Sequence, residues 1–139
     1  MKFLNYNLLK TLLSLLLFLG CTNAKINSKF LNGYWKIDYV MHKGEKFIPE
    51  SVNLLYDYYF IKENKGIYKK ASPLINGTFE TSLDQTSFTL VEENNNTYIK
   101  FLTRWDQWSK KISHLDSVSL VLEHDQRQFY YKRPLTILK

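Results

Sequence analysis

The chain has 139 residues and a formal net charge of +6, and 45% of its residues are hydrophobic. This length suits one domain with its own core. No run of lysine and arginine is interleaved with aromatic residues, which disfavours nucleic-acid binding, and a single cysteine excludes a disulfide within the chain.

The first twenty residues have the layout of an export signal. Lys2 and Lys10 flank a polar, basic start, and an apolar core follows at residues 12–19. This run is too short to span a membrane, which takes about 20 apolar residues. Removing residues 1–20 takes away two of the 19 basic residues and none of the 13 acidic ones, which leaves 119 residues with a net charge of +4.

The sequence Phe18-Leu19-Gly20-Cys21 resembles the lipobox of bacterial lipoproteins. The resemblance implies that Cys21 is lipidated on sulfur and becomes the new N-terminus. Several acyl chains, such as palmitate, would then hold the protein on a membrane at ~0.8 kcal/mol per buried methylene. Thr22 stands where an aspartate signals inner-membrane retention in some bacteria, so the resemblance favours an outer-membrane anchor facing the periplasm. In an organism with one membrane, the outer leaflet of that membrane replaces it.

A polar segment without apolar period separates this cysteine from the first strand signal. We therefore divide the chain into a signal peptide (1–20), a lipidated tether (21–30), a β-barrel domain (31–134) and a C-terminal tail (135–139).

From Gly33 onward, apolar and polar residues alternate in short segments with turn residues between them, at a spacing of roughly ten residues. This pattern predicts an all-β fold, a single antiparallel meander barrel of about eight to ten strands. Asp57 marks the solvated face of its strand in this scheme. The expected interior consists of Trp35, Ile37, Tyr39, Tyr56, Tyr58, Phe60, Phe79, Phe88, Leu90, Ile99, Phe101, Leu120, Leu122, Phe129 and Tyr131.

The segment around residues 105–114 is ambiguous. Trp105, Trp108, Ile112 and Leu115 would line one face of a short helix, whereas Trp108 and Ile112 also share one face of a strand. We favour the strand, because the segment lacks good helix caps and its surroundings are all β.

At Gly33-Tyr34-Trp35 the pattern resembles the Gly-x-Trp opening of lipocalins, which small bacterial lipocalin-like lipoproteins combine with a lipobox. The likeness continues through Gly77-x-Phe79 and the ending Phe129-x-Tyr131-x-Arg133. It implies that Trp35 plugs one barrel end and that Arg133 lies across its ring. The chain is shorter than a typical lipocalin, and residues 135–139 leave no room for the helix that follows the barrel in that family, which argues against a large cavity.

A lipocalin-like barrel implies that a small hydrophobic ligand is bound inside. The alternative is that the same side chains fill a solid barrel, and that the protein acts as an interaction or inhibitor module through its loops. Inward phenol hydroxyls favour a ligand, since they need polar partners. The candidate pocket residues are Tyr58, Phe60, Phe79, Phe101, Leu120 and Tyr131.

Other constellations point to no chemistry. Trp105 and Trp108 form either a lid on the barrel end or an exposed patch for a partner, which the sequence does not identify. His42, His114 and His124 are too far apart for a metal motif. We therefore expect a protein that is not an enzyme and that uses no cofactor and no metal.

Overall fold

The computed structural model describes residues 25–50 and 55–134, so the signal peptide, Cys21 and the C-terminal tail lie outside the described residues. No helix among the described residues is long and apolar enough to cross a membrane. The elements are one short 3-10 helix, η1 (Ser28–Leu31), and the strands β1 (Gly33–His42), β2 (Glu45–Phe47), β3 (Tyr56–Lys62), β4 (Lys65–Pro73), β5 (Phe79–Thr81), β6 (Thr86–Glu93), β7 (Asn96–Leu102), β8 (Gln107–Leu115), β9 (Ser119–His124) and β10 (Arg127–Lys132).

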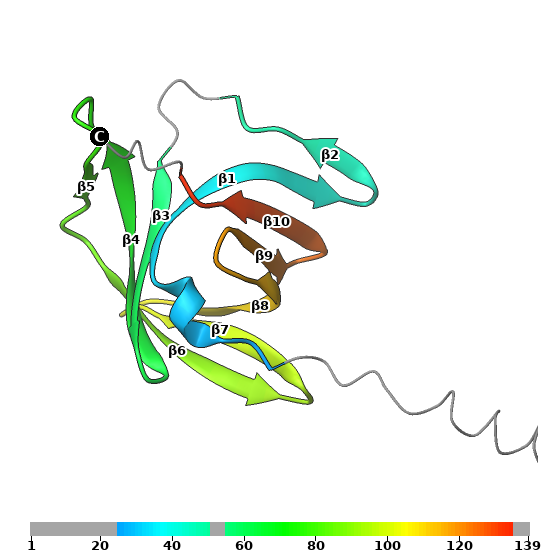
Figure 1. Ribbon diagram of the computed structural model, residues 1–139. Coiled ribbons are helices and arrows are strands. Elements are labelled where there is room, and N and C mark those ends of the chain that lie inside the picture. The colour runs from blue at the N-terminus through cyan, green and yellow to red at the C-terminus, as the bar shows by residue number, and fades with distance from the viewer. Residues whose placement is uncertain (1–24, 51–54, 135–139) are drawn as a thin grey trace, which may run out of the picture.

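The strands form a closed antiparallel barrel (Figure 1). Its wall runs β1-β3-β4-β6-β7-β8-β9-β10, and β10 pairs with β1 to close the ring. Two short strands add to this wall, with β2 on β1 and β5 on β4. The expected all-β, lipocalin-like meander barrel is confirmed, and the ambiguous segment is strand β8.

The prediction that Tyr39 faces the interior is wrong, because β1 contains a β-bulge. Its register against β10 shifts between Ile37 and Tyr39, which turns Tyr39 to the outside. There its ring stacks on the ring of Tyr130 at a centroid distance of 4.3 Å.

The inward face of β3 is also opposite to the prediction. Asp57, Tyr59 and Ile61 are buried, whereas Phe60 is 52% exposed. The pairing explains this reversal: Trp35 lies opposite Asp57, and cross-strand partners point to the same face of a sheet. Both faces of β3 carry apolar side chains, so alternation alone left the register open.

The outer face of β3 is covered by an aromatic cluster that we call the outer aromatic cluster. Phe79 of β5 stacks on Tyr34 with a centroid distance of 4.1 Å and contacts the edge of Tyr56. Tyr58 lies 4.8 Å from Tyr34. The expected inward positions of Tyr56, Tyr58 and Phe79 are therefore wrong, because β5 folds over the outside of the barrel and gives these rings partners there.

One end of the barrel is closed by η1 and the buried indole of Trp35. The indole Nε1 donates a hydrogen bond to the carbonyl oxygen of Leu31, at 2.9 Å, and both residues are 0% exposed. The guanidinium of Arg133 lies over the indole ring, 3.8 Å from its centroid. Gly33 has a φ of +106°, and a Cβ there would lie 2.7 Å from the guanidinium, so this close approach requires glycine.

Arg133 also forms hydrogen bonds to three segments that meet at the closed end of the barrel. It donates hydrogen bonds to the carbonyl oxygens of Phe30, Tyr34 and Ser117. Residues from η1, β1 and the turn between β8 and β9 are thus held by one side chain.

Replacing Arg133 tests this arrangement. We expect Arg133→Ala to lower the free energy of unfolding by about 2–4 kcal/mol, since it removes the cation–π contact and leaves three carbonyl groups without their donor. Urea denaturation followed by tryptophan fluorescence measures the change. Arg127→Ala, at the exposed start of β10, is the matched control and should change stability by less than about 0.5 kcal/mol. Equal effects of the two substitutions would contradict the arrangement.

Candidate functional site

Three of the six predicted pocket residues line the barrel interior. Phe101, Leu120 and Tyr131 are at most 5% exposed and belong to the core. Phe60 faces solvent, and Tyr58 and Phe79 belong to the outer aromatic cluster. The candidate site therefore consists of the side chains that do point inward.

A carboxylate lies inside the barrel, which the sequence reading did not predict. Asp57 is 4% exposed, and its Oδ1 accepts a hydrogen bond from the hydroxyl of Tyr68 at 2.9 Å. The ammonium of Lys70 contacts the same oxygen at 2.5 Å. Lys70 is the cross-strand partner of Asp57 and is 48% exposed, so this ion pair faces solvent at the end of the barrel opposite η1, which we call the open end.

The protonation equilibria of these groups follow from burial and from the carboxylate. Burial, reinforced by the charge of Asp57, raises the pKa of the Tyr68 phenol to about 12, so this hydroxyl remains a donor at neutral pH. Burial alone would lower the pKa of Lys70. The Asp57 carboxylate and the Tyr68 side chain together more than offset this effect, through charge and hydrogen bonding, and the pKa of Lys70 is raised.

Two more phenols lie beside the carboxylate. Burial, followed by the charge of Asp57, raises the pKa of both Tyr59 and Tyr131 well above the ordinary value for tyrosine. The Tyr59 hydroxyl is buried and has no hydrogen-bond partner among the described residues. Such an unpaired buried hydroxyl costs stability, and a polar ligand atom or a water molecule bonded to it would remove that cost.

A second inward lysine lies across the barrel on β8. Lys110 pairs with Ile99 of β7, and its ammonium lies 5.3 Å from the Phe129 ring centroid and 5.8 Å from that of Phe101. Burial lowers the pKa of Lys110. The interior therefore holds two lysines whose environments shift their pKa values in opposite directions. We call Asp57, Tyr59, Tyr68, Lys70, Lys110 and Tyr131 the interior polar cluster.

Aromatic rings fill much of the remaining interior. Phe88 contacts Tyr59 and Phe101, and Phe101 stacks on Trp108 at 5.1 Å. Packing is tight at Gly66, where an added Cβ would lie 2.4 Å from the ring of Phe88. A ligand in this interior would therefore be small, or would displace rings at the open end.

One hollow of about 480 Å³ lies outside the barrel wall. It is bordered by the bulged part of β1, by β5 with its preceding turn and by the end of β10. Ile37 and Phe79 supply apolar walls, and Lys36 and Arg133 supply positive charge. None of the predicted pocket residues that belong to the core lines this hollow.

The two tryptophans considered together as a lid or a patch separate in the structure. Trp108 is half-buried and stacks inside the barrel on Phe101. Trp105 is 84% exposed in the connection between β7 and β8, where Arg104 lies 4.9 Å from its ring centroid. Only Trp105 is placed to contact a partner in solution.

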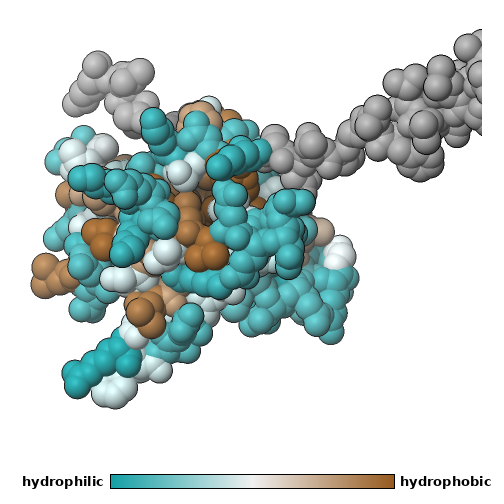
Figure 2. All heavy atoms as spheres, turned by 90° about the horizontal axis from the view of Figure 1, so that it is seen from below, coloured by the Kyte–Doolittle hydropathy of each residue, from teal (hydrophilic) through white to brown (hydrophobic). Residues whose placement is uncertain are grey.

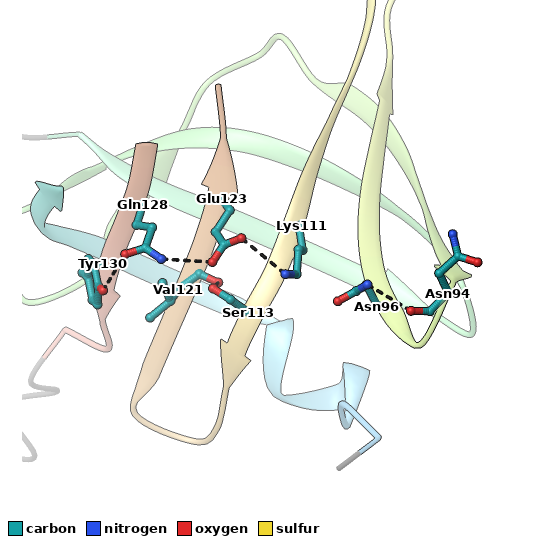
Figure 3. Close-up of polar contacts among 8 residues, drawn as sticks. All are labelled: Asn94, Asn96, Lys111, Ser113, Val121, Glu123, Gln128 and Tyr130. Carbon is teal, nitrogen blue, oxygen red and sulfur yellow. Dashed lines mark hydrogen bonds and ion pairs between the residues drawn. The ribbon is translucent and has the colours of Figure 1, made fainter. Parts of the chain in front are cut away.

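The outer face of β8, β9 and β10 carries a polar network (Figure 3). Glu123 binds the ammonium of Lys111 at 3.4 Å and accepts a hydrogen bond from the Gln128 amide at 3.1 Å. Tyr130 donates its hydroxyl proton to Gln128 at 3.0 Å. Neighbouring lysines of β8 therefore differ: Lys111 is held by a carboxylate outside, while Lys110 points inward.

The histidines have local roles in turns. His114 Nε2 lies 2.9 Å from Asp116 Oδ2, and His124 lies beside Asp125 at 3.2 Å. Asp116 accepts hydrogen bonds from the backbone N–H groups of Val118 and Ser119, which lower the pKa of its carboxyl group. No group of three metal-ligating side chains forms among residues 25–50 and 55–134.

Sequence reasoning missed most of the interior polar cluster, although one signal was present. Trp108 and Ile112 were placed on one face of a strand, and a period of two places Lys110 on that same face. No comparable signal existed for Asp57, because the neighbouring tyrosines of β3 occupy both faces.

Comparisons with known proteins give structural likeness only. No family model and no curated protein matches the chain. The chain is similar to a lipocalin-like protein from Bacteroides uniformis ATCC 8492, with 13% identity and a TM-score of 0.47 over 76% of this chain and 99% of the other. It is also similar to an uncharacterized protein from Bacteroides eggerthii DSM 20697, with 8% identity and a TM-score of 0.46 over 75% and 99%. The lipocalin-like architecture given above rests on strand order and closure.

The unpaired hydroxyl of Tyr59 generates a prediction about stability. Tyr59→Phe should raise the free energy of unfolding of the ligand-free protein by about 1–2 kcal/mol, because it removes an unsatisfied buried polar group. Tyr68→Phe removes a hydrogen bond to a buried carboxylate and should lower the same quantity by about 1–3 kcal/mol. Urea unfolding curves compare the two. Destabilisation by Tyr59→Phe would show that its hydroxyl has a partner.

Proposed function

We propose that this protein is a lipid-anchored, lipocalin-like carrier that binds a small hydrophobic ligand at the bacterial cell envelope, without catalysing a reaction on it. The ligand enters at the open end and directs a polar group toward the interior polar cluster. The observation that carries this proposal is the buried, unpaired hydroxyl of Tyr59 beside the Asp57 carboxylate.

The chemistry of the interior supports an amphipathic ligand. Rings and aliphatic side chains offer apolar contact, while Asp57, Lys70 and Tyr59 offer both donors and acceptors. A largely apolar site with a few placed polar groups is the usual composition of a small-molecule pocket. The polar groups would orient the ligand, and the rings would supply most of the binding free energy.

The proposed anchor is Cys21, which lies outside the described residues. Lys25, at the start of the described chain, forms an ion pair with Glu92 of β6, at 3.9 Å. η1 then closes the adjacent barrel end, so a short segment joins Cys21 to the closed end. The proposed location is the outer membrane, with the barrel facing the periplasm.

Intact mass spectrometry of the full-length gene product, purified from bacterial membranes, tests the anchor. We expect a mass that lacks residues 1–20 and gains acyl groups on Cys21. In the Cys21→Ser variant the acyl mass should disappear and the protein should leave the membrane fraction. A wild-type chain that retains residues 1–20 would contradict the anchor without affecting the ligand site.

Native mass spectrometry of the same preparation tests ligand binding, with dodecan-1-ol as the probe. We expect a 1:1 adduct for the wild type, and an affinity about fivefold lower for Tyr59→Phe, since one hydrogen bond to the ligand hydroxyl is lost. Tyr58→Phe, on the outer face of the same strand, is the matched control and should bind as the wild type does. Binding that responds to Tyr58→Phe and not to Tyr59→Phe would contradict an interior site.

One observation favours the second candidate, a solid barrel that acts through its loops. Leu102 and Trp105 are 58% and 84% exposed at the connection between β7 and β8. The molecular face in Figure 2 is mostly hydrophilic, with hydrophobic residues near its centre and at its left and lower edges. If native mass spectrometry shows no adduct of the probe, this second candidate becomes the better account.

A further inference from the structure

Positive charge is in excess at the hollow outside the barrel wall. We call this hollow of about 480 Å³, between β1, the turn and strand of β5 and the end of β10, the outer hollow. Its charged lining residues, among those that the structure describes, are Lys36, Asp38, Lys132 and Arg133. Three cations thus accompany one carboxylate, which gives a net charge of +2. A concave site lined mainly by one sign of charge attracts ligands of the opposite sign.

The two lysines of the outer hollow face each other across a strand pair. Lys36 of β1 is the direct partner of Lys132 in the antiparallel pairing with β10. Lys132 binds Asp38 at 2.8 Å, whereas Lys36 has no carboxylate within 4.0 Å among residues 25–50 and 55–134. Like charges directly opposite one another destabilise a sheet. A bound anion would offset this repulsion.

The guanidinium of Arg133 retains hydrogen-bonding capacity. A guanidinium has five N–H donors, and three of those of Arg133 donate to the carbonyl oxygens of Phe30, Tyr34 and Ser117. Two N–H groups therefore have no partner in the part of the chain that the structure describes. Burial lowers the pKa of Arg133, and no carboxylate of those residues compensates for its lost hydration. A ligand carboxylate would supply both the acceptors and the charge.

The rest of the outer hollow is mostly apolar. Its apolar lining residues are Ile37, Tyr56, Pro73, Leu74, Phe79 and Pro134. Phe79 is held in place by stacking on Tyr34 and by the edge contact with Tyr56, so this wall is formed before any ligand arrives. A preformed apolar site of a few hundred Å³ with a few polar groups suits a small molecule.

The β-bulge of β1 helps to form the outer hollow. A regular strand presents every second side chain to one face, but β1 contributes the three consecutive residues 36–38 to this lining. The register of β1 against β10 shifts at this point. Bulges redirect side chains and are common beside functional sites.

We propose that the outer hollow binds a small aromatic or aliphatic carboxylate, with the anionic group toward Lys36 and Arg133 and the apolar body against Ile37 and Phe79. The excess charge selects an anion, and the concave apolar wall selects a compact body over an extended membrane surface. This site lies outside the barrel, so it is independent of the interior site of the proposed function.

An NMR titration of the ¹⁵N-labelled full-length gene product in a nonionic detergent tests the inference, with 2-naphthoate as the probe. We expect amide shifts to change mainly at residues 36–38 and 77–79. The amide 2-naphthamide has nearly the same shape and no charge, and should bind at least about tenfold more weakly, since it loses the attraction of the cations. Equal affinities for the two probes, or shifts confined to other strands, would overturn the inference.

A matched pair of variants tests the role of charge. Lys36→Gln should weaken 2-naphthoate binding about three- to fivefold, as expected for an exposed ion pair. Lys62→Gln is the control, because Lys62 is also the cross-strand partner of a lysine, Lys65, but lies outside the lining of the outer hollow. It should bind as the wild type does. Equal losses in both variants would show attraction to net charge alone and overturn the inference.

Saturating dodecan-1-ol separates this site from the interior one. The alcohol should leave the affinity for 2-naphthoate unchanged. Displacement of 2-naphthoate by the alcohol would place both in one site and overturn the inference, while the proposed function stands. If the alcohol does not bind and 2-naphthoate gives the expected shifts, only the proposed function fails.

Two other occupants are outcomes of the same test. If 2-naphthoate gives no shifts, and Lys36→Gln weakens sedimentation with phosphatidylglycerol vesicles, this face contacts a membrane and the inference is overturned. Binding of 2-naphthoate that appears only after removal of residues 135–139 would assign the outer hollow to that tail, and would equally overturn it.

Discussion

The antiparallel pairing of Trp35 with Asp57 decides which side chains enter this barrel. Trp35 is fully buried at the closed end, and cross-strand partners share a face, so the carboxylate must also point inward. Because successive side chains of a strand point to opposite faces, Tyr59 also points into the interior and Tyr58 points outside. The pairing of β3 with β4 also brings Tyr68 and Lys70 inward.

A carboxylate inside a small barrel is tolerated because its partners come from the neighbouring strand. Replacing water around a buried charge requires strong hydrogen bonds, and Lys70 with Tyr68 supplies them at one oxygen. The cluster is incomplete at Tyr59, whose hydroxyl has no partner among the described residues. An unpaired buried polar group requires an explanation, and the proposed function supplies one, because a polar ligand atom would give this hydroxyl its partner.

The sequence was sufficient for the architecture but not for the site. Regular alternation with short turns predicted the closed antiparallel barrel, and the strand at residues 107–115 followed from its surroundings. Tyr39 was misplaced because a β-bulge leaves no clear trace in an alternating pattern. The wrong face of β3 was predicted to point inward, because aromatic rings occupy both of its faces. The outer rings have packing partners only because Phe79 of β5 lies against them.

Lys110 shows that an interior polar residue can be predicted once the inward face of its strand is known. It shares a face with Trp108 and Ile112, which were already expected to point the same way. A charged residue that lies between two apolar residues on the inward face of a strand therefore indicates a polar group inside the barrel. The same argument applied to Asp57 would have required the register of β1 against β3, which is a tertiary property.

A cysteine accessibility scan along β3 tests the central claim, that this strand turns Asp57, Tyr59 and Ile61 inward. In a Cys21→Ser background, single cysteines at Tyr59, Phe60, Ile61 and Lys62 are reacted with a maleimide under native conditions. The account predicts fast reaction at positions 60 and 62 and protection at positions 59 and 61. The opposite alternation, with position 60 protected and positions 59 and 61 reactive, would place the carboxylate outside and contradict the account.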